Sequence, residues 1–300
     1  MILTRAFVKR MPTRNSLAFL SAIYGLVFAI HSAPHCLGQS MQVKAWTLLE
    51  AAARQPKTER RATAVRVLGL LPDNDRATQL AVDALRDPKP EVRVAAATAL
   101  GKMRAASSAA QLKKALSDKE FSVVLAAAHA LRELKDPACY EVYYAIVTGQ
   151  RKSSEGFFEQ ETEVFHDPKE LAKMGFEQGI GYVPYAGIGW DAVRTIMKDR
   201  SEGSPVKAAS VSNLASDPDP RTAAALVNAT HDRNWVVRVA ALQAIAERGD
   251  PTLAGKIEPL LNDSKKEVQY TAAATILRLG ARSDAGKTAD KTGLNQAIPK

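Results

Sequence analysis

The chain has 300 residues, of which 46% are hydrophobic and 24% are charged. This composition excludes a disordered chain and provides enough apolar surface for one large domain or two small ones. Lys and Arg exceed Asp and Glu by 41 − 32 = 9, but residues 1–40 contribute Arg5, Lys9, Arg10 and Arg14 and no acid. The remaining excess of 37 − 32 = +5 is spread without a basic run, which argues against nucleic acid as a partner.

Residues 1–40 have the layout of a secretory signal peptide, with a basic stretch, an apolar run from Leu17 to Ile30 and a polar close. We expect cleavage after Gly38 or Ser40 and a mature protein that is periplasmic or secreted. The apolar run is shorter than the roughly 20 residues that a membrane-spanning helix needs, so an uncleaved membrane anchor is the alternative. Cleavage at either site leaves Cys139 as the one thiol, which we interpret as a small buried helix residue.

The rest of the chain contains an internal repeat. Four segments that begin at Asp87, Asp118, Asp232 and Asp263 superpose without a gap, at intervals of 118 − 87 = 31 and 263 − 232 = 31 residues. Two further copies begin near residues 58 and 201. One position is always Leu or Ile, at Leu68, Leu100, Leu131, Leu214, Ile245 and Ile276. Another is always small, at Ala64, Ala96, Ala127, Ser210, Ala241 and Ala272.

Each copy predicts a helical hairpin. The Asp at its start is an N-cap signal, because a carboxylate can accept hydrogen bonds from the free amides of a helix's first turn. Apolar residues then recur at the spacing of one helical face, and a second, shorter apolar helix follows, such as AQLKKAL at 110–116. One hairpin cannot bury its own faces, so the copies must stack. The sequence therefore predicts an all-α fold, a right-handed α-solenoid.

The segment DPKPEVRVAAATALG from Asp87 resembles the HEAT-like repeat of phycobilisome lyases and of many bacterial scaffold proteins, and the resemblance covers about residues 44–280. In that family the Arg of the Val-Arg pair often joins the Asp of the preceding turn in a ladder of ion pairs. Lys207 keeps the charge of that Arg, whereas Val124 and Gln269 depart from it. The resemblance implies structural roles for Asp87, Arg93, Asp118, Asp232, Arg238 and Asp263.

The residues do not support the enzymes that use such repeats. Deoxyhypusine hydroxylase requires paired His-Glu dyads to hold two irons, whereas none of the five histidines is followed by Glu. His166 and His231 stand beside Asp at expected turns, which favours a capping or solvated role. No metal-ligand spacing or Gly-rich phosphate loop occurs. We therefore expect no catalytic residue, cofactor or metal; an enzyme subunit, such as a bilin lyase, that uses the solenoid as a substrate platform is the alternative.

One unit is interrupted. Leu131 and Leu214 are 83 residues apart where two periods need 62, so 83 − 62 = 21 residues are extra. They belong to a degenerate unit at 149–200 with the uncharged stretch GIGYVPYAGIGW, in which Pro184 prevents one continuous helix. We expect an apolar hairpin or loop at 175–190. It can be a buried plug between the two half-stacks, a protruding loop that binds a partner, or a shallow membrane contact.

The predicted organisation is a signal peptide (1–40), N-terminal HEAT-like repeats (41–148), a degenerate repeat with a Gly- and aromatic-rich insertion (149–200), C-terminal HEAT-like repeats (201–282) and a flexible tail (283–300). The predicted function is that of a non-enzymatic, monomeric scaffold of the cell envelope that binds another protein. Membrane association through 175–190 is a further alternative. The candidate partner-binding residues are Phe157, Phe158, Tyr182, Tyr185 and Trp190.

Overall fold

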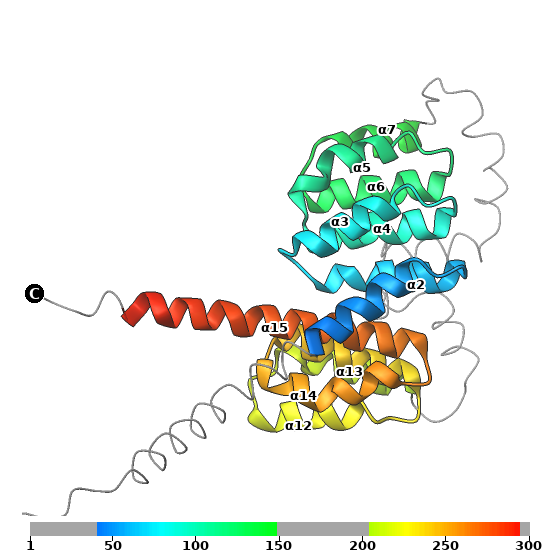
Figure 1. Cartoon of the computed structure of the whole chain (residues 1–300). Coiled ribbons are helices and arrows are strands. Elements are labelled where there is room, and N and C mark those ends of the chain that lie inside the picture. The colour runs from blue at the N-terminus through cyan, green and yellow to red at the C-terminus, as the bar shows by residue number, and fades with distance from the viewer. Residues whose placement is uncertain (1–40, 149–203, 295–300) are drawn as a thin grey trace, which may run out of the picture. The chain divides into compact units, whose positions relative to one another are not determined.

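The computed structural model describes residues 41–148 and 204–294, and all regular secondary structure in these ranges is helical (Figure 1). The first helix covers residues 41–53. It is followed by α2 (Thr58–Val67), η1 (Leu68–Leu70), α3 (Asp75–Ala84), α4 (Pro90–Met103), η2 (Ala106–Ser108), α5 (Ala109–Ala115), α6 (Phe121–Glu133) and α7 (Ala138–Thr148). The second range contains α11 (Ser204–Asn213), η3 (Leu214–Ser216), α12 (Pro220–Ala229), α13 (Trp235–Arg248), η4 (Pro251–Leu253), α14 (Ala254–Ile257), η5 (Glu258–Asn262) and α15 (Lys266–Leu294). The expected signal peptide and the degenerate unit at 149–200 lie outside the described residues.

The helices form two layers, as an α-solenoid requires. In one layer α2 packs on α4 and α4 on α6, while α11 packs on α13 and α13 on α15. In the second layer the shorter helices α3, α5, α12 and α14 pack on the long helices that follow them. The predicted all-α solenoid of stacked hairpins is therefore confirmed.

The recurring apolar positions form the core. Leu68, Leu100, Leu131, Ile245 and Ile276 are at most 1% exposed, and so are the small residues Ala64, Ala96, Ala127, Ala241 and Ala272. The copy in α11 differs, because Leu214 is half-buried and Ser210 is exposed. Among the described long helices, α11 packs on α13.

The repeated Asp residues close the loops before the long helices, but they are not the N-cap residues that the sequence predicted. Asp87 Oδ1 accepts a hydrogen bond from the Lys89 amide at 2.9 Å, and Lys89 is the N-cap of α4. Asp232 makes the same contact with the amide of Asn234, which caps α13. Each carboxylate thus forms a local turn two residues before the cap and keeps its other oxygen available for a neighbouring repeat.

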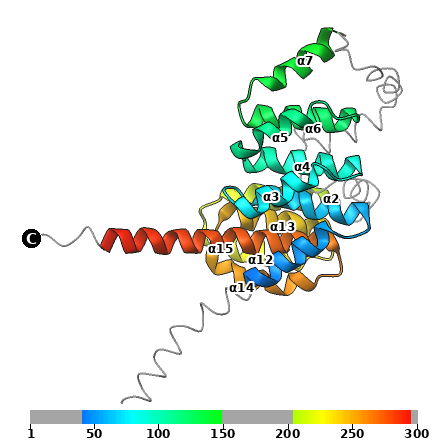
Figure 2. The same cartoon turned by 45° about the horizontal axis from the view of Figure 1, so that its top comes forward.

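The two repeat regions stack in an order that differs from their order in the sequence. A stack that followed the sequence would join them through the degenerate unit at 149–200 and would leave the last repeat at one end. In the structure α15, from the C-terminal region, packs against α2, from the N-terminal region (Figures 1 and 2). The long helices therefore follow the order α11, α13, α15, α2, α4, α6, and α15 is an internal helix of this layer.

The end of α15 also differs from the prediction. The long helices α4, α6 and α13 are followed by left-handed residues, Arg104, Lys135 and Gly249, with φ of 53°, 59° and 70°. The equivalent residue in α15, 249 + 31 = 280, is helical, and the helix continues to Leu294 where a flexible tail was expected from residue 283. The Ala, Arg and Lys residues of this stretch favour the helix.

The ion-pair ladder and the candidate interaction surface

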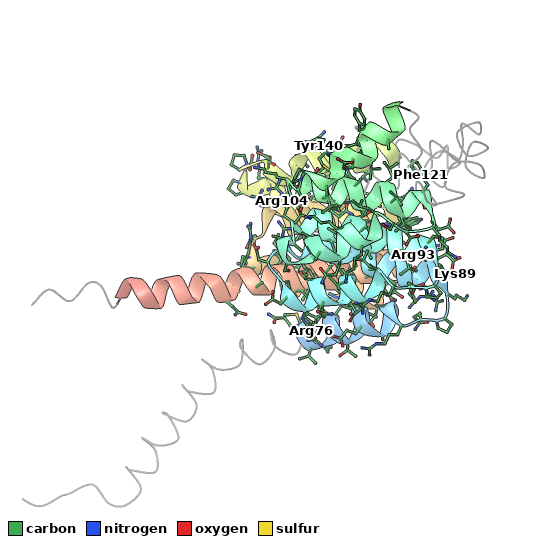
Figure 3. The ribbon with its side chains drawn as sticks, turned by 90° about the horizontal axis from the view of Figure 1, so that it is seen from above. Arg76, Lys89, Arg93, Arg104, Phe121 and Tyr140 are labelled. Atoms are coloured by element: carbon green, nitrogen blue, oxygen red, sulfur yellow. The ribbon has the colours of Figure 1, made fainter. Side chains whose placement is uncertain are left out.

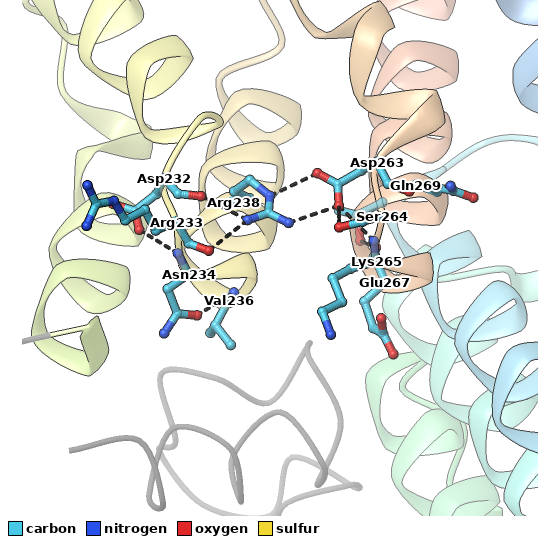
Figure 4. Close-up of polar contacts among 11 residues, drawn as sticks. Asp232, Arg233, Asn234, Val236, Arg238, Asp263, Ser264, Lys265, Glu267 and Gln269 are labelled. Carbon is cyan, nitrogen blue, oxygen red and sulfur yellow. Dashed lines mark hydrogen bonds and ion pairs between the residues drawn. The ribbon is translucent and has the colours of Figure 1, made fainter. Parts of the chain in front are cut away.

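Buried ion pairs connect successive repeats. Arg93 of α4 donates from Nε to Asp118 Oδ2 at 2.8 Å and from NH2 to Asp118 Oδ1 at 2.7 Å, and the two side chains are 8% and 15% exposed. Arg238 of α13 holds Asp263 in the same way, with both distances 2.9 Å (Figure 4). The remaining guanidinium nitrogen of each Arg donates to the carbonyl of the Asp that opens its own repeat. The planar guanidinium therefore fixes its own loop and the next loop together.

The direction and extent of this ladder correct the expectation from the family resemblance. Each Arg pairs with the Asp of the following turn, 25 residues later, whereas the resemblance implied the preceding turn. Arg61 adds a pair with Asp87 at 2.8 Å, which its one-residue phase shift concealed in the sequence. Lys207 pairs with Asp232, so the retained charge retains the contact.

At the two positions where the charge of the Arg is missing, other contacts appear. Val124 cannot bind the next Asp, Asp136, and Lys113 of α5 takes that place at 2.8 Å. Gln269 keeps the contact with its own loop by donating to the Asp263 carbonyl.

The ladder lowers the pKa values of Asp87 and Asp232. Burial raises the pKa of Asp87, but the hydrogen bonds from Arg61 and the Lys89 amide outweigh burial, so the net pKa lies below the ordinary value. The pKa of Asp232 is lowered in the same manner, against burial, by Lys207 and the Asn234 amide. The paired groups satisfy each other's hydrogen bonds, which fits a structural role.

The apolar helix α7 presents two tyrosines outward. Tyr140 and Tyr144 are each 64% exposed, and they lie four residues apart and therefore on one helical face. Figure 3 shows Tyr140 projecting away from the helices. Cys139, on the opposite side, is buried, as the sequence predicted. We call the surface formed by Tyr140 and Tyr144 the α7 tyrosine face.

Sequence reasoning missed the α7 tyrosine face. Its signal is present in YEVYYAIV, residues 140–147, where three tyrosines stand among four apolar residues. The five aromatic residues predicted to bind a partner, Phe157, Phe158, Tyr182, Tyr185 and Trp190, lie outside the described residues.

The histidines and the acidic residues form no further site in the described ranges. His231 lies in the turn after α12, where Nδ1 is 3.1 Å from the Val227 carbonyl oxygen, which agrees with the predicted turn role. Burial and the charge of Arg132 lower the pKa of His129. Within residues 41–148 and 204–294, no three His, Cys, Asp or Glu side chains are placed to hold a metal ion. Nor does this part of the chain contain a helix of the length and apolarity that crossing a membrane requires.

Comparison with known proteins identifies a repeat family. An engineered protein of known crystal structure matches with 17% identity and a TM-score of 0.26, over 79% of this chain and 96% of that chain. No curated protein matches the chain. The family model described as HEAT repeats matches residues 36–139 and 191–278, which together exceed half of the chain. The chain therefore belongs to the HEAT-repeat family.

Proposed function

We propose that this protein is a non-enzymatic scaffold that binds another protein, and that the α7 tyrosine face is one of its binding surfaces. HEAT repeats present extended surfaces built from successive hairpins and commonly serve protein–protein interaction. The observation that carries the proposal is the exposure of Tyr140 and Tyr144, 64% each, on an otherwise apolar helix. Tyrosine is enriched at the energetic centres of protein interfaces, because it combines a large apolar ring with a hydroxyl.

The chemistry of the α7 tyrosine face defines the partner. Two rings on one face of a helix offer an apolar ridge, and their hydroxyls form hydrogen bonds at its rim. A partner with a shallow apolar groove and polar groups at its edge fits this surface.

Substitution of both tyrosines tests the proposal. Tyr140→Ser with Tyr144→Ser should abolish retention of a partner from an envelope fraction, at an unchanged melting temperature. The matched control is Arg221→Ser, which alters a side chain that is 91% exposed on another repeat. Retention that survives the tyrosine changes but is lost with Tyr182→Ala and Tyr185→Ala would move the binding surface to the insertion. Retention unaffected by both pairs contradicts the proposal.

We also propose that the protein is exported. The basic, apolar and polar order of residues 1–40 supports this location. The N-terminal peptide of the protein isolated from its native cells should begin at residue 39 or 41. An intact Met1 form in the soluble cytoplasmic fraction would contradict export.

A further inference from the structure

The first helix, residues 41–53, completes a repeat whose other half comes from the opposite end of the chain. Lys44 forms an ion pair with Glu258 of η5 at 3.0 Å, and Glu50 forms one with Arg76 of α3 at 2.7 Å. The guanidinium of Arg76 also lies 4.5 Å from the centre of the Trp46 ring. The helix therefore lies between the short helix before α15 and the short helix after α2, where the partner of α15 belongs.

The packing of this helix agrees with that position. Ala45, Leu49 and Ala52 form its buried face and are at most 2% exposed. A Cβ atom on Gly280 of α15 would lie 2.1 Å from the Gln42 side chain, so the two segments are in close approach. In the other long helices, the chain near the position equivalent to Gly280 turns toward the second helix of the repeat. We call the pair formed by residues 41–53 and α15 the joint repeat.

The step from the joint repeat to α2 lacks the ion pair that characterises most other steps. In α15, Gln269 occupies the position of the ladder Arg. In the loop before α2, Gln55 occupies the position of the ladder Asp. Its carbonyl oxygen accepts a hydrogen bond from Arg61, as the Asp87 carbonyl oxygen accepts one from Arg93. Neither Gln269 nor Gln55 is charged. A hydrogen bond from Arg278 Nη1 to the Leu70 carbonyl oxygen, at 3.0 Å, crosses this step. The ion pairs of helix 41–53 are also more exposed, with Lys44 at 61% and Arg76 at 55%, than the buried ladder pairs.

We propose that the joint repeat is a non-covalent clasp at which the stack opens, so that the N-terminal and C-terminal arrays of repeats separate while each stays folded. Exposed ion pairs contribute little to stability, whereas breaking a buried pair leaves an uncompensated charge. Separation between α15 and α2 breaks no ladder pair, but separation between α2 and α4, α4 and α6, or α13 and α15 breaks one. Local opening occurs at the interface that takes the least free energy to separate, and in this proposal that is the interface between α15 and α2.

Hydrogen exchange of the full chain, read by mass spectrometry, tests the clasp. Leu49→Ala removes buried apolar contacts from the joint repeat, and Val43→Ala changes a side chain that is 65% exposed on the same helix. Leu49→Ala should speed exchange about tenfold or more in residues 41–53, in η1 and in the first turns of α15 together. Exchange in α4, α6 and α13 should stay unchanged, and Val43→Ala should leave all of these rates unchanged.

Two results would overturn the clasp. If exchange accelerates only in residues 41–53, the helix unfolds locally and the two arrays stay together. If exchange accelerates equally in α4, α6 and α13, the whole stack opens as one unit. If Leu49→Ala does not fold, the milder Leu49→Val variant alters the same buried face and should accelerate exchange by a smaller factor in the same three segments together. Acceleration in one of these segments alone would contradict the clasp.

Discussion

The Arg–Asp pairs show how a single residue can couple two repeats. Arg93 is held by two carboxylate oxygens of the next loop and by a carbonyl of its own loop. Removing one partner leaves the other buried and unsatisfied, so the cost exceeds that of an exposed pair.

We expect Arg93→Met to lower the free energy of unfolding by roughly 2–4 kcal/mol, because Asp118 loses both of its guanidinium hydrogen bonds. Urea denaturation measures this change. Arg221→Met, which removes an exposed pair with Asp219, should have a much smaller effect. Equal losses in the two variants would show that the ladder does not support the stack.

The lowered pKa values predict acid sensitivity. The ladder pairing of Asp87 and Asp232 stabilises the fold fully above the unfolded-state pKa of about 3.9 and is lost as the pH falls through the lower folded-state values. The stability of the wild-type protein should therefore fall steeply below about pH 4. In Asp87→Asn with Asp232→Asn the same decline should be shallower, as measured by urea denaturation between pH 3 and pH 7. An unchanged slope would contradict the assigned pairs.

Between helices, small residues determine how closely the repeats approach. Ala96 and Ala241 are fully buried where long helices meet. We expect Ala96→Leu or Ala241→Leu to lower the free energy of unfolding by about 1–3 kcal/mol through overpacking. Lys114→Leu on α5 is a better control than Lys113→Leu, because Lys113 pairs with Asp136 and Lys114 is exposed. Melting temperatures lowered equally by both kinds of change would contradict the helical phase.

Two helical glycines provide a sharper test of this close approach. A Cβ atom on Gly101 of α4 would lie 2.9 Å from the Cα of Ala130 in α6, whereas a Cβ atom on Gly255 of α14 meets nothing within 4 Å. Gly255→Ala should raise the melting temperature, since alanine favours the helix by about 0.5–1 kcal/mol. Gly101→Ala should lower it, because the α6 backbone must move. The same sign for both changes would contradict the α4–α6 packing.

The elements show what sequence reasoning could predict. The 31-residue period placed the long helices and their buried Leu and Ala positions, because periodic burial is a local property of each helix. The sequence predicted Asp87 as the N-cap of the next helix, but Lys89 is the N-cap and Asp87 lies in the turn before it. Which of the two residues caps the helix depends on the residue at which α4 begins. The pairing of Arg61 with Asp87 was missed because the copy at Thr58 is shifted by one residue. Tyr140 and Tyr144 were missed because the repeat was recognised from its apolar and small positions. The exposure of the two tyrosines also depends on which helix lies beside α7, which is not a local property of the sequence.

At the scale of the whole described molecule, the unit order could not be read from the repeats. Every copy offers the same faces to its neighbours, so a local pattern is equally compatible with α2 following α15 or with α11 following α6. The uncharged Gln55 and Gln269 lie at the junction, but in the sequence alone they appear as two unrelated losses of a charge. The two regions meet through α15 and α2, and the segment 175–190, with its three alternative roles, lies outside the described residues.

This order changes the expected effect of truncation. If the last repeat were a cap, removal of residues 263–300 would expose one face. Because α15 is internal, its removal should also release helix 41–53 and leave α2 without its neighbour. Limited proteolysis should therefore cut the truncated chain within residues 41–53 and at α2. Protection of these segments equal to that of the full chain contradicts an internal α15.

The most direct test of the shared repeat is the proximity of residues 44 and 258, which are 214 residues apart in the sequence. In Lys44→Cys with Glu258→Cys, a short bismaleimide should form an intramolecular cross-link that runs at monomer mass. The single-cysteine variants report background reaction from the native thiols. Lys44→Cys with Lys114→Cys is the negative control, because α3 separates α5 from helix 41–53 in the layer, at roughly 20 Å for two helix spacings. Rapid cross-linking of the 44–258 pair within one chain is the result that we predict. Labelling of both cysteines without a cross-link, or a cross-link found at dimer mass, would contradict the shared repeat.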